Sequence, residues 1–389
     1  MNRIRTRCRW AGTGGPVCIL AAVALAWAPL RAAQEHQHGP SREQYRVEPR
    51  RVAESPVIDG LLDEAVWQTA ALIESFTQQE PAEGQPATER TQVLLLYDAA
   101  SLYVGLRAYD ADPAGIIATE MRRDSERLLD DEDSFQIILD TFDDSRSGYM
   151  FVTNPLGAKL EQQVSEEGEG GRRGSTSNIN RDWDGVWNVA ARRTAEGWVA
   201  EIEIPLVTVR FPESAQQTWG VNFLRNIRRK NEQVFWAPIP KAYSLTRVSL
   251  AGSLRSMDGL DRGMDLRLKP FAIAGGRRDR TGTRTVEKGL SDAGLDVKYG
   301  VSSGLNLDLT LNTDFAQAEV DEEQVNLTRF PLFFPEKRDF FLENSGQFNL
   351  GTAGNDRLAD LFFSRRIGLS ESGQLIPMIG GARLSGKTA

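Results

Sequence analysis

From Arg51 to Met257 the chain repeats one pattern, in which short apolar or alternating runs each end at a Gly, Asp or Pro turn. In the clearest example, Thr91–Tyr97 and Leu102–Tyr109 flank the turn Asp98–Ser101, which predicts a β-hairpin. Its first run is apolar on both faces, as expected of a central strand covered on both sides. Further runs of this kind are Ser134–Phe142, Tyr149–Asn154, Trp187–Arg193, Trp198–Ile204, Trp219–Arg228 and Gln233–Ala237. Strands of this length and spacing predict two packed sheets, a β-sandwich.

Two segments depart from this pattern. Asp63–Ile73 places Val66, Trp67 and Ala70 on one face of a helix that Asp63 caps, so a helix is predicted there. Residues 166–180, EEGEGGRRGSTSNIN, are Gly-rich and charged without periodicity, which predicts a loop inside the domain.

After residue 260 the runs Leu266–Ala274, Leu295–Val301 and Gly304–Asn312 look like strands. In the last, leucines alternate strictly with Asn, Asp and Thr, as in a soluble sheet or in an outer-membrane strand with its apolar side towards lipid. Two short runs follow, near Leu361–Arg366 and Ile379–Leu384. These strands are fewer than the roughly eight that close the smallest membrane barrel. If this part of the chain forms the first strands of an antiparallel barrel, we therefore expect the chain to be a truncated piece of a longer protein.

The amino terminus has the layout of a secretory signal peptide, with four arginines before the apolar run Val17–Leu30 and small residues at Ala32 and Ala33. The resulting division is a signal peptide over residues 1–33, a polar leader over 34–50, a sandwich over 51–258 and a partial barrel over 259–389. The signal peptide by itself predicts export; only a family resemblance implies the periplasm or the outer membrane as the location.

Both cysteines and both histidines lie within the first 38 residues. The folded part therefore lacks the residues for Ser-His-Asp or Cys-His catalysis, thiolate or imidazole metal sites, and disulfides. Without the five arginines of the signal peptide, 41 basic residues face 54 acidic ones, a balance of −13. Such a surface repels nucleic acid, so no nucleic-acid partner is expected.

Two groups of acidic residues suggest further functions, a calcium site and a catalytic pair. The run Asp130-Asp131-Glu132-Asp133 could bind calcium, with Asp131 and Asp133 as ligands, although solvated acidic residues are the more common case and no other cofactor is indicated. Glu201 and Glu203 lie on one side of a predicted strand, about 7 Å apart, a separation that also suits an inverting glycosidase pair. An ordinary polar sheet face explains the second pattern better, so no catalytic residue is assigned.

Five tryptophans between residues 183 and 236 suggest either stacking platforms for sugar rings or filling between two sheets. Burial statistics favour the core for any single one of them.

Several strings together are similar to known families. VIDGLLDEAVWQTA (57–70), the segments 76–110 and 131–157, GWVAEIEIPLVTVRF (197–211) and 217–238 resemble a family 9 carbohydrate-binding module, a β-sandwich attached to xylanases and related enzymes. DFAQAEVDEEQVNLTRFPLFFPEKRDFFLEN (314–344) resembles the bacterial domain-of-unknown-function family 5916, in which such a sandwich precedes an outer-membrane barrel. The resemblance covers most of residues 50–350.

The resemblance also implies a sugar site. In sugar-binding members two tryptophans clamp the sugar, and a Glu in an Asp-Ser-Val-Glu-Ile strand accepts its hydroxyls. The matching strand here, residues 133–137, has Gln136 at the Glu position, and Leu128-Leu129-Asp130 stands where a Trp is expected. The remaining candidate contacts are Trp183 and Trp187 as walls, with Arg122, Arg123 and Asn154 as polar groups.

We therefore expect a secreted carbohydrate-binding module attached to an outer-membrane barrel, active in glycan binding, uptake and carbohydrate catabolism. One alternative is an activity associated with hydrolysis of O-glycosyl bonds. The other is a structural plug of the barrel that binds no sugar.

Overall fold

The computed structural model describes residues 43–168, 178–181, 183–263, 266–281, 284–301, 305–312, 339–342 and 378–386, and the single positions 364, 367, 368 and 376. The predicted signal peptide, most of the polar leader, the center of the 166–180 segment and the run near Leu361 lie outside these residues.

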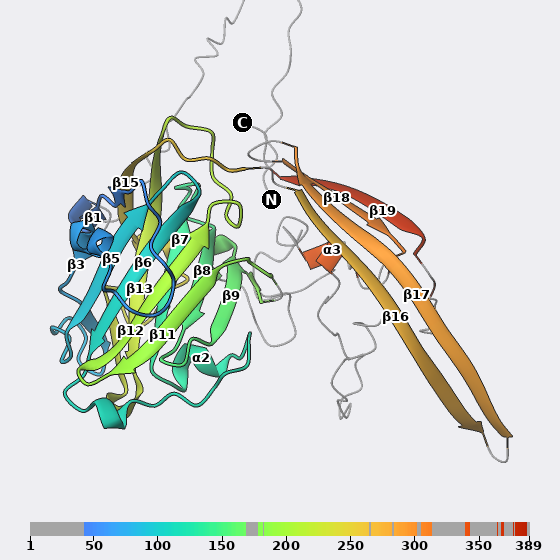
Figure 1. Cartoon of the computed structure of the whole chain (residues 1–389), viewed down its shortest axis with the longest axis horizontal. Helices are drawn as coiled ribbons and strands as arrows, with labels where there is room; N and C mark the ends of the chain where they lie inside the picture. The colour runs from blue at the N-terminus through green and yellow to red at the C-terminus, as the bar shows by residue number, and fades with distance from the viewer. Residues whose placement is uncertain are drawn as a thin grey trace, which may run out of the picture. The chain divides into compact units, whose positions relative to one another are not determined.

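Residues 43–263 form the predicted sandwich (Figure 1). Sheet A runs β1-β15-β13-β7-β8-β9-β10, with β14 on β13 and β4 on β14; sheet B runs β11-β12-β6-β5-β2, with β3 on β5. The strands of sheet A are β1 (Arg46–Val47), β4 (Thr77–Glu80), β7 (Ser134–Asp140), β8 (Gly148–Thr153), β9 (Lys159–Val164), β10 (Ile179–Asn180), β13 (Gln216–Ile227), β14 (Glu232–Phe235) and β15 (Gly252–Asp258). Those of sheet B are β2 (Arg50–Arg51), β3 (Ala71–Ile73), β5 (Thr91–Tyr97), β6 (Ser101–Tyr109), β11 (Asn188–Thr194) and β12 (Gly197–Pro205). All the predicted hairpins are confirmed.

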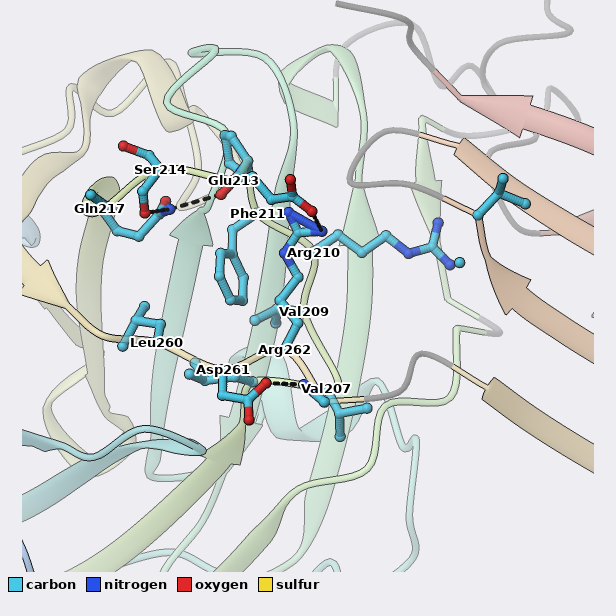
Figure 2. Close-up of a pocket in the computed structure, with 16 residues that line it drawn as sticks. Val207, Val209, Arg210, Phe211, Glu213, Ser214, Gln217, Leu260, Asp261 and Arg262 are labelled. Carbon is cyan, nitrogen blue, oxygen red and sulfur yellow. Dashed lines mark hydrogen bonds and ion pairs between the residues drawn. The ribbon is translucent and has the colours of Figure 1, made fainter.

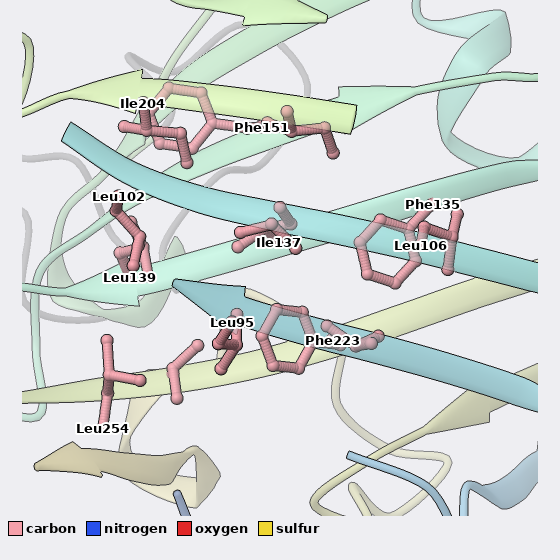
Figure 3. Close-up of a cluster of buried hydrophobic side chains, with 14 of the residues drawn as sticks. Leu95, Leu102, Leu106, Phe135, Ile137, Leu139, Phe151, Ile204, Phe223 and Leu254 are labelled. Carbon is pink, nitrogen blue, oxygen red and sulfur yellow. The ribbon is translucent and has the colours of Figure 1, made fainter. Parts of the chain in front are cut away.

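The main core lies between the two sheets, where alternate residues of each strand meet (Figure 3). Leu95 and Leu106 of sheet B and Phe135 and Phe223 of sheet A belong to it, and the rings of the two phenylalanines stack with centroids 5.8 Å apart. Burial of these side chains is the main stabilising contribution of the fold.

Both outer faces of the sandwich carry a second apolar layer. On sheet B, Leu94, Leu96 and Tyr103 pack with Trp67, which explains why β5 is apolar on both faces. On sheet A, Ile138 and Leu224 pack with Leu128 from the short helix α2 (Arg127–Asp130) and with the covering segment 239–250.

The helix predicted at Asp63–Ile73 is wrong. Its middle forms only a 3-10 turn, η1 (Ala65–Thr69), and its end, Ala71–Ile73, pairs with β5 as strand β3. The cause is tertiary, because Trp67 is drawn onto sheet B and its indole donates to the Glu201 carboxylate at 2.8 Å. A helix of one or two turns has too few internal hydrogen bonds to resist such contacts.

The described strands after residue 264 form sheet C, in the order β16 (Leu266–Thr281), β17 (Arg284–Gly300), β18 (Leu305–Leu311) and β19 (Gly380–Gly386), all antiparallel. The first two strands are much longer than the predicted runs. In the described part of the chain, no helix combines the length and apolar character needed to cross a membrane.

Candidate functional site

Gln136 lies on the outer face of sheet A and is 2% exposed. Its amide donates to the Leu129 carbonyl at 2.7 Å and its neighbours across the sheet, Leu224 and Val152, belong to the outer apolar layer. The position that matches the sugar-accepting Glu is therefore enclosed, and its side chain anchors α2.

Trp183 and Trp187 are 8% and 1% exposed and belong to the main core. Trp183 packs against Tyr149 with ring centroids 5.0 Å apart, and Lys159 Nζ lies 5.1 Å from the Trp187 ring centroid. Nearly all the surface of both rings is therefore in contact with protein. Of the two readings of the tryptophan cluster, the structure supports core filling.

Arg123 and Trp187 both bind one buried carboxylate, Glu161, which sequence reasoning missed. Glu161 of β9 accepts a hydrogen bond from Trp187 Nε1 at 2.9 Å and also pairs with Arg123. Burial raises the pKa of Glu161, and its bonds to the indole and the guanidinium oppose that shift. Arg123 keeps 45% of its side chain exposed and also binds Asp184 at 2.6 Å. The strand sequence KLEQQV is mostly polar and gives little signal that Glu161 is buried.

Asn154 and Arg122 belong to a second polar network. Asn154 is buried, and its amide donates to the Glu120 carbonyl at 2.8 Å and to Glu132 at 3.0 Å. Glu132 in turn accepts from the backbone N–H groups of Thr119 and Glu120. Arg122 is 79% exposed and pairs with Glu120 at 3.0 Å, which holds the pKa of that carboxyl at about 2. The network fixes the loop that exposes Arg122.

The two proposed calcium ligands are not brought together. Asp131 is 58% exposed and faces Arg127 at 3.8 Å, whereas Asp133 is fully buried and accepts from Ile117 N–H at 2.8 Å. Among the described residues, no cluster of three or more His, Cys, Asp or Glu side chains has the arrangement of a metal site.

Glu201 and Glu203 both bind neighbouring groups. Glu201 is fully buried and accepts from Gly60 N–H at 2.8 Å, Asp59 N–H at 2.9 Å and the Trp67 indole. Glu203 accepts from Ser101 at 3.0 Å and Asn188 at 2.8 Å. These contacts give Glu201 a structural role.

A hollow in the sandwich surface is lined in part by the segments 206–217 and 260–263 (Figure 2). Its aromatic ring, Phe211, is 3% exposed, with the Arg262 guanidinium 5.2 Å from its centroid and Trp219 behind it at 5.4 Å. The Gln217 amide is bonded to the carbonyls of Pro212 and Ser214. The hollow therefore offers charge and little free aromatic surface.

Tyr243 is the one aromatic side chain in the described part of the sandwich that is exposed, at 42%. It lies in the segment that covers the outer face of sheet A, and the Arg247 guanidinium lies 4.5 Å from its ring centroid. Glu167 pairs with Arg247 at 3.0 Å, and Ser244 and Thr246 present hydroxyls 2.7 Å apart in the same segment. Sequence reasoning missed this group; an aromatic residue among polar ones after a strand, KAYSLTR, was the signal.

Comparison with protein families gives a match to the second part of the chain. Residues 264–379 match the model of a family described as a domain of unknown function, DUF5916, as the sequence resemblance implied. Among curated proteins, no significant sequence match is found.

Three solved structures resemble 54% of the chain. A family 9 carbohydrate-binding module from Caldicellulosiruptor kristjanssonii, solved with glucose, is 17% identical over 94% of its own length, with a TM-score of 0.37. The structure of such a module from the same organism with cellotriose gives 18% identity, 92% coverage and a TM-score of 0.35. A Bacteroides uniformis protein, described as a candidate carbohydrate-binding protein, gives 12%, 98% and 0.42.

Proposed function

We propose that this chain is a glycan-binding protein of the cell envelope, in which the sandwich captures carbohydrate and residues after 264 attach it to the outer membrane. The proposed attachment to the membrane, the membrane half of the proposal, rests on the polarity of sheet C. The proposed binding of carbohydrate, the sugar half, rests on Tyr243 and its neighbours.

The strand register places apolar side chains on one face of sheet C and charged side chains on the other. One cross-strand row is apolar, Leu268, Val297, Leu309 and Ala382, and the adjacent row is charged, Arg267, Lys298, Asp308 and Arg383. The side chains of Leu268 and Leu309 are 58% and 38% exposed, whereas Asp308 is 1% exposed. A soluble sheet buries the opposite face; exposed leucines over enclosed polar groups suit a strand whose outer side meets lipid. This inverted polarity is the observation that carries the proposal.

Tyr243 supplies the sugar half. A flat ring can stack on the C–H face of a sugar, and nearby donors and acceptors can bind its hydroxyls. Arg247, Ser244 and Thr246 supply such groups in the same segment. Arg122 and Arg123 remain proposed contacts on a second surface, whereas Trp183, Trp187, Asn154 and Gln136 are buried and have structural roles.

Sugar binding is tested by titrating the full chain with glucose and cellotriose, the sugars in the Caldicellulosiruptor complexes. Tyr243→Ala should weaken binding at least about tenfold, as loss of a stacking ring does in binding sites. Leu72→Ala, at another exposed apolar side chain (50%), is the matched control. Arg122→Ala and Arg123→Ala test the second surface. No binding to these sugars or to a glycan array would contradict the sugar half.

Membrane attachment is tested separately, by incorporation of the full chain into phosphatidylcholine vesicles. Leu309→Asp and Leu311→Asp should each reduce incorporation, because a charge on the lipid side of a strand opposes insertion; Asp costs less than the about 2–4 kcal/mol that Arg or Lys costs at the bilayer midplane. Leu72→Asp, on the sandwich, should leave incorporation unchanged. Equal incorporation of all three variants would contradict the membrane half.

A further inference from the structure

Gln79 connects strand β4 to the segment that carries Tyr243. Its side chain is buried, 6% exposed, and its amide Nε2 lies within hydrogen-bonding distance of three backbone carbonyl oxygens. These are Ile239 at 3.0 Å, Pro240 at 3.1 Å and Tyr243 at 3.0 Å.

The three carbonyls belong to one turn. Tyr243 N–H donates to the Pro240 carbonyl at 2.9 Å, which closes the turn, and Gln79 binds both the first and the last residue of that turn. A single amide therefore sets the path of the backbone on either side of Lys241. The bond to Ile239 is buried and the other two are partly buried, so removal of the donor leaves the Ile239 carbonyl without a partner that water can readily replace.

A second connection joins the same two segments at the surface. Lys241 Nζ lies 2.8 Å from Glu80 Oε2 and 3.0 Å from the Pro81 carbonyl. Both charged side chains are well exposed, at 38% and 45%, so this ion pair contributes little. The buried amide of Gln79 is the main attachment of the turn to β4.

We propose that Gln79 is a positioning residue for glycan recognition: it holds the 239–243 turn so that Tyr243 is presented to the sugar. This inference rests on the proposed sugar site at Tyr243. Gln79 itself, being buried, contacts no ligand.

The adjacent Gln78 provides a matched control. It has the same side chain and the same 6% exposure, but its amide donates to Pro86 at 2.7 Å and its oxygen accepts from Ala82 N–H at 3.3 Å. Gln78 therefore stabilises its own turn, through residues 82 and 86, and not the 239–243 turn.

The experiment compares Gln79→Met with Gln78→Met in the full chain. Methionine keeps the side-chain length and removes the donor, so both variants are expected to fold, which thermal melting checks. Gln79→Met should raise the Kd for cellotriose about tenfold and speed amide hydrogen exchange of residues 241–245 about tenfold, the scale of one lost buried hydrogen bond. Gln78→Met should change neither quantity.

Hydrogen exchange keeps the two proposals separable, because it needs no sugar. Unchanged exchange and unchanged affinity in a folded Gln79→Met variant would overturn the positioning role alone. Faster exchange without any change in affinity would overturn it too, since the turn would then move without affecting recognition. Failure of the unsubstituted chain to bind any glycan would overturn the proposed function and the role of Gln79 in it.

Discussion

Arg383 donates to the carboxylate of Asp308 at 2.7 Å across strands β18 and β19, with 12% and 2% of the two side chains exposed. The Phe340 ring, from the short helix α3 (Asp339–Leu342), lies 5.5 Å from the guanidinium and covers it. A charged pair enclosed in this way costs desolvation energy, and removal of one partner leaves the other buried without its counter-charge.

Arg383→Met should therefore destabilise the chain by about 3–5 kcal/mol. The double variant Asp308→Asn/Arg383→Met should recover part of this loss, because no unpaired charge remains. Arg51→Met is the control, since its pair with Asp258 at 3.1 Å is exposed and should contribute at most about 1 kcal/mol. Heat denaturation of the full chain in detergent measures all three. Equal effects of Arg383→Met and Arg51→Met would contradict the prediction.

Glu201 and Glu203 provide a second comparison within one strand. Glu201→Ala should lower the free energy of unfolding by about 3 kcal/mol or more, because it leaves two backbone N–H groups and the Trp67 indole without an acceptor. Glu203→Ala, whose partners are nearer the surface, should cost about 1 kcal/mol. Urea unfolding gives both values. Glycoside cleavage by the unsubstituted chain that disappears in a folded Glu203→Ala variant would favour the hydrolytic alternative.

Asp133 should make stability depend on pH. Burial raises its pKa from 3.8 to about 6; the Ile117 N–H and Arg225 oppose this shift, and Asp110 adds to it. Because the pKa is higher in the folded state, the folded state favours the protonated acid. The stability that this proton contributes is complete below about pH 4 and is lost as the pH rises through 6.

Asp133→Asn removes this titration. The unsubstituted chain should lose stability relative to the variant by up to about 1.4 kcal/mol per pH unit between these limits. Urea unfolding at pH 4, 5, 6 and 7 measures the difference. A difference that stays constant over this range would show that Asp133 does not titrate there.

Gly197 should resist substitution more strongly than Gly84. Both have positive φ, +143° and +80°, but a Cβ at Gly197 would collide with the Ala108 carbonyl of the paired strand, whereas nothing lies within 4 Å at Gly84. Gly197→Ala should cost more than about 3 kcal/mol, from strain and from the displaced strand, and Gly84→Ala about 1 kcal/mol from strain. Melting temperatures of the two variants test this, and similar values would contradict it.

The hairpins could be predicted because each is a local pattern. Two short apolar or alternating runs around Asp98–Ser101 or Thr194–Gly197 need only their own side chains and turn residues to specify a strand pair. The failed helix at Asp63–Ile73 shows the limit of this reasoning. Its periodicity was correct as a pattern, but Glu201, 134 residues away, provides the acceptor that fixes Trp67.

The candidate site was harder to predict for the same reason. Trp183, Trp187 and Asn154 have residue types suited to sugar binding, yet their roles depend on whether the surface over them is open, and burial is a property of the whole packing. Tyr243 is exposed because the segment around it lies over sheet A, which no local pattern specifies.

The sequence alone therefore determined the hairpins of the sandwich, their turns and the confinement of Cys and His to the first 38 residues. These follow from residue order and composition, which act over a few positions. Tertiary structure decided which carboxylates are enclosed, which ring reaches solvent and which face of sheet C is exposed. Such outcomes depend on contacts between residues far apart in the chain, as between Gln79 and Tyr243, and only the folded packing sets them.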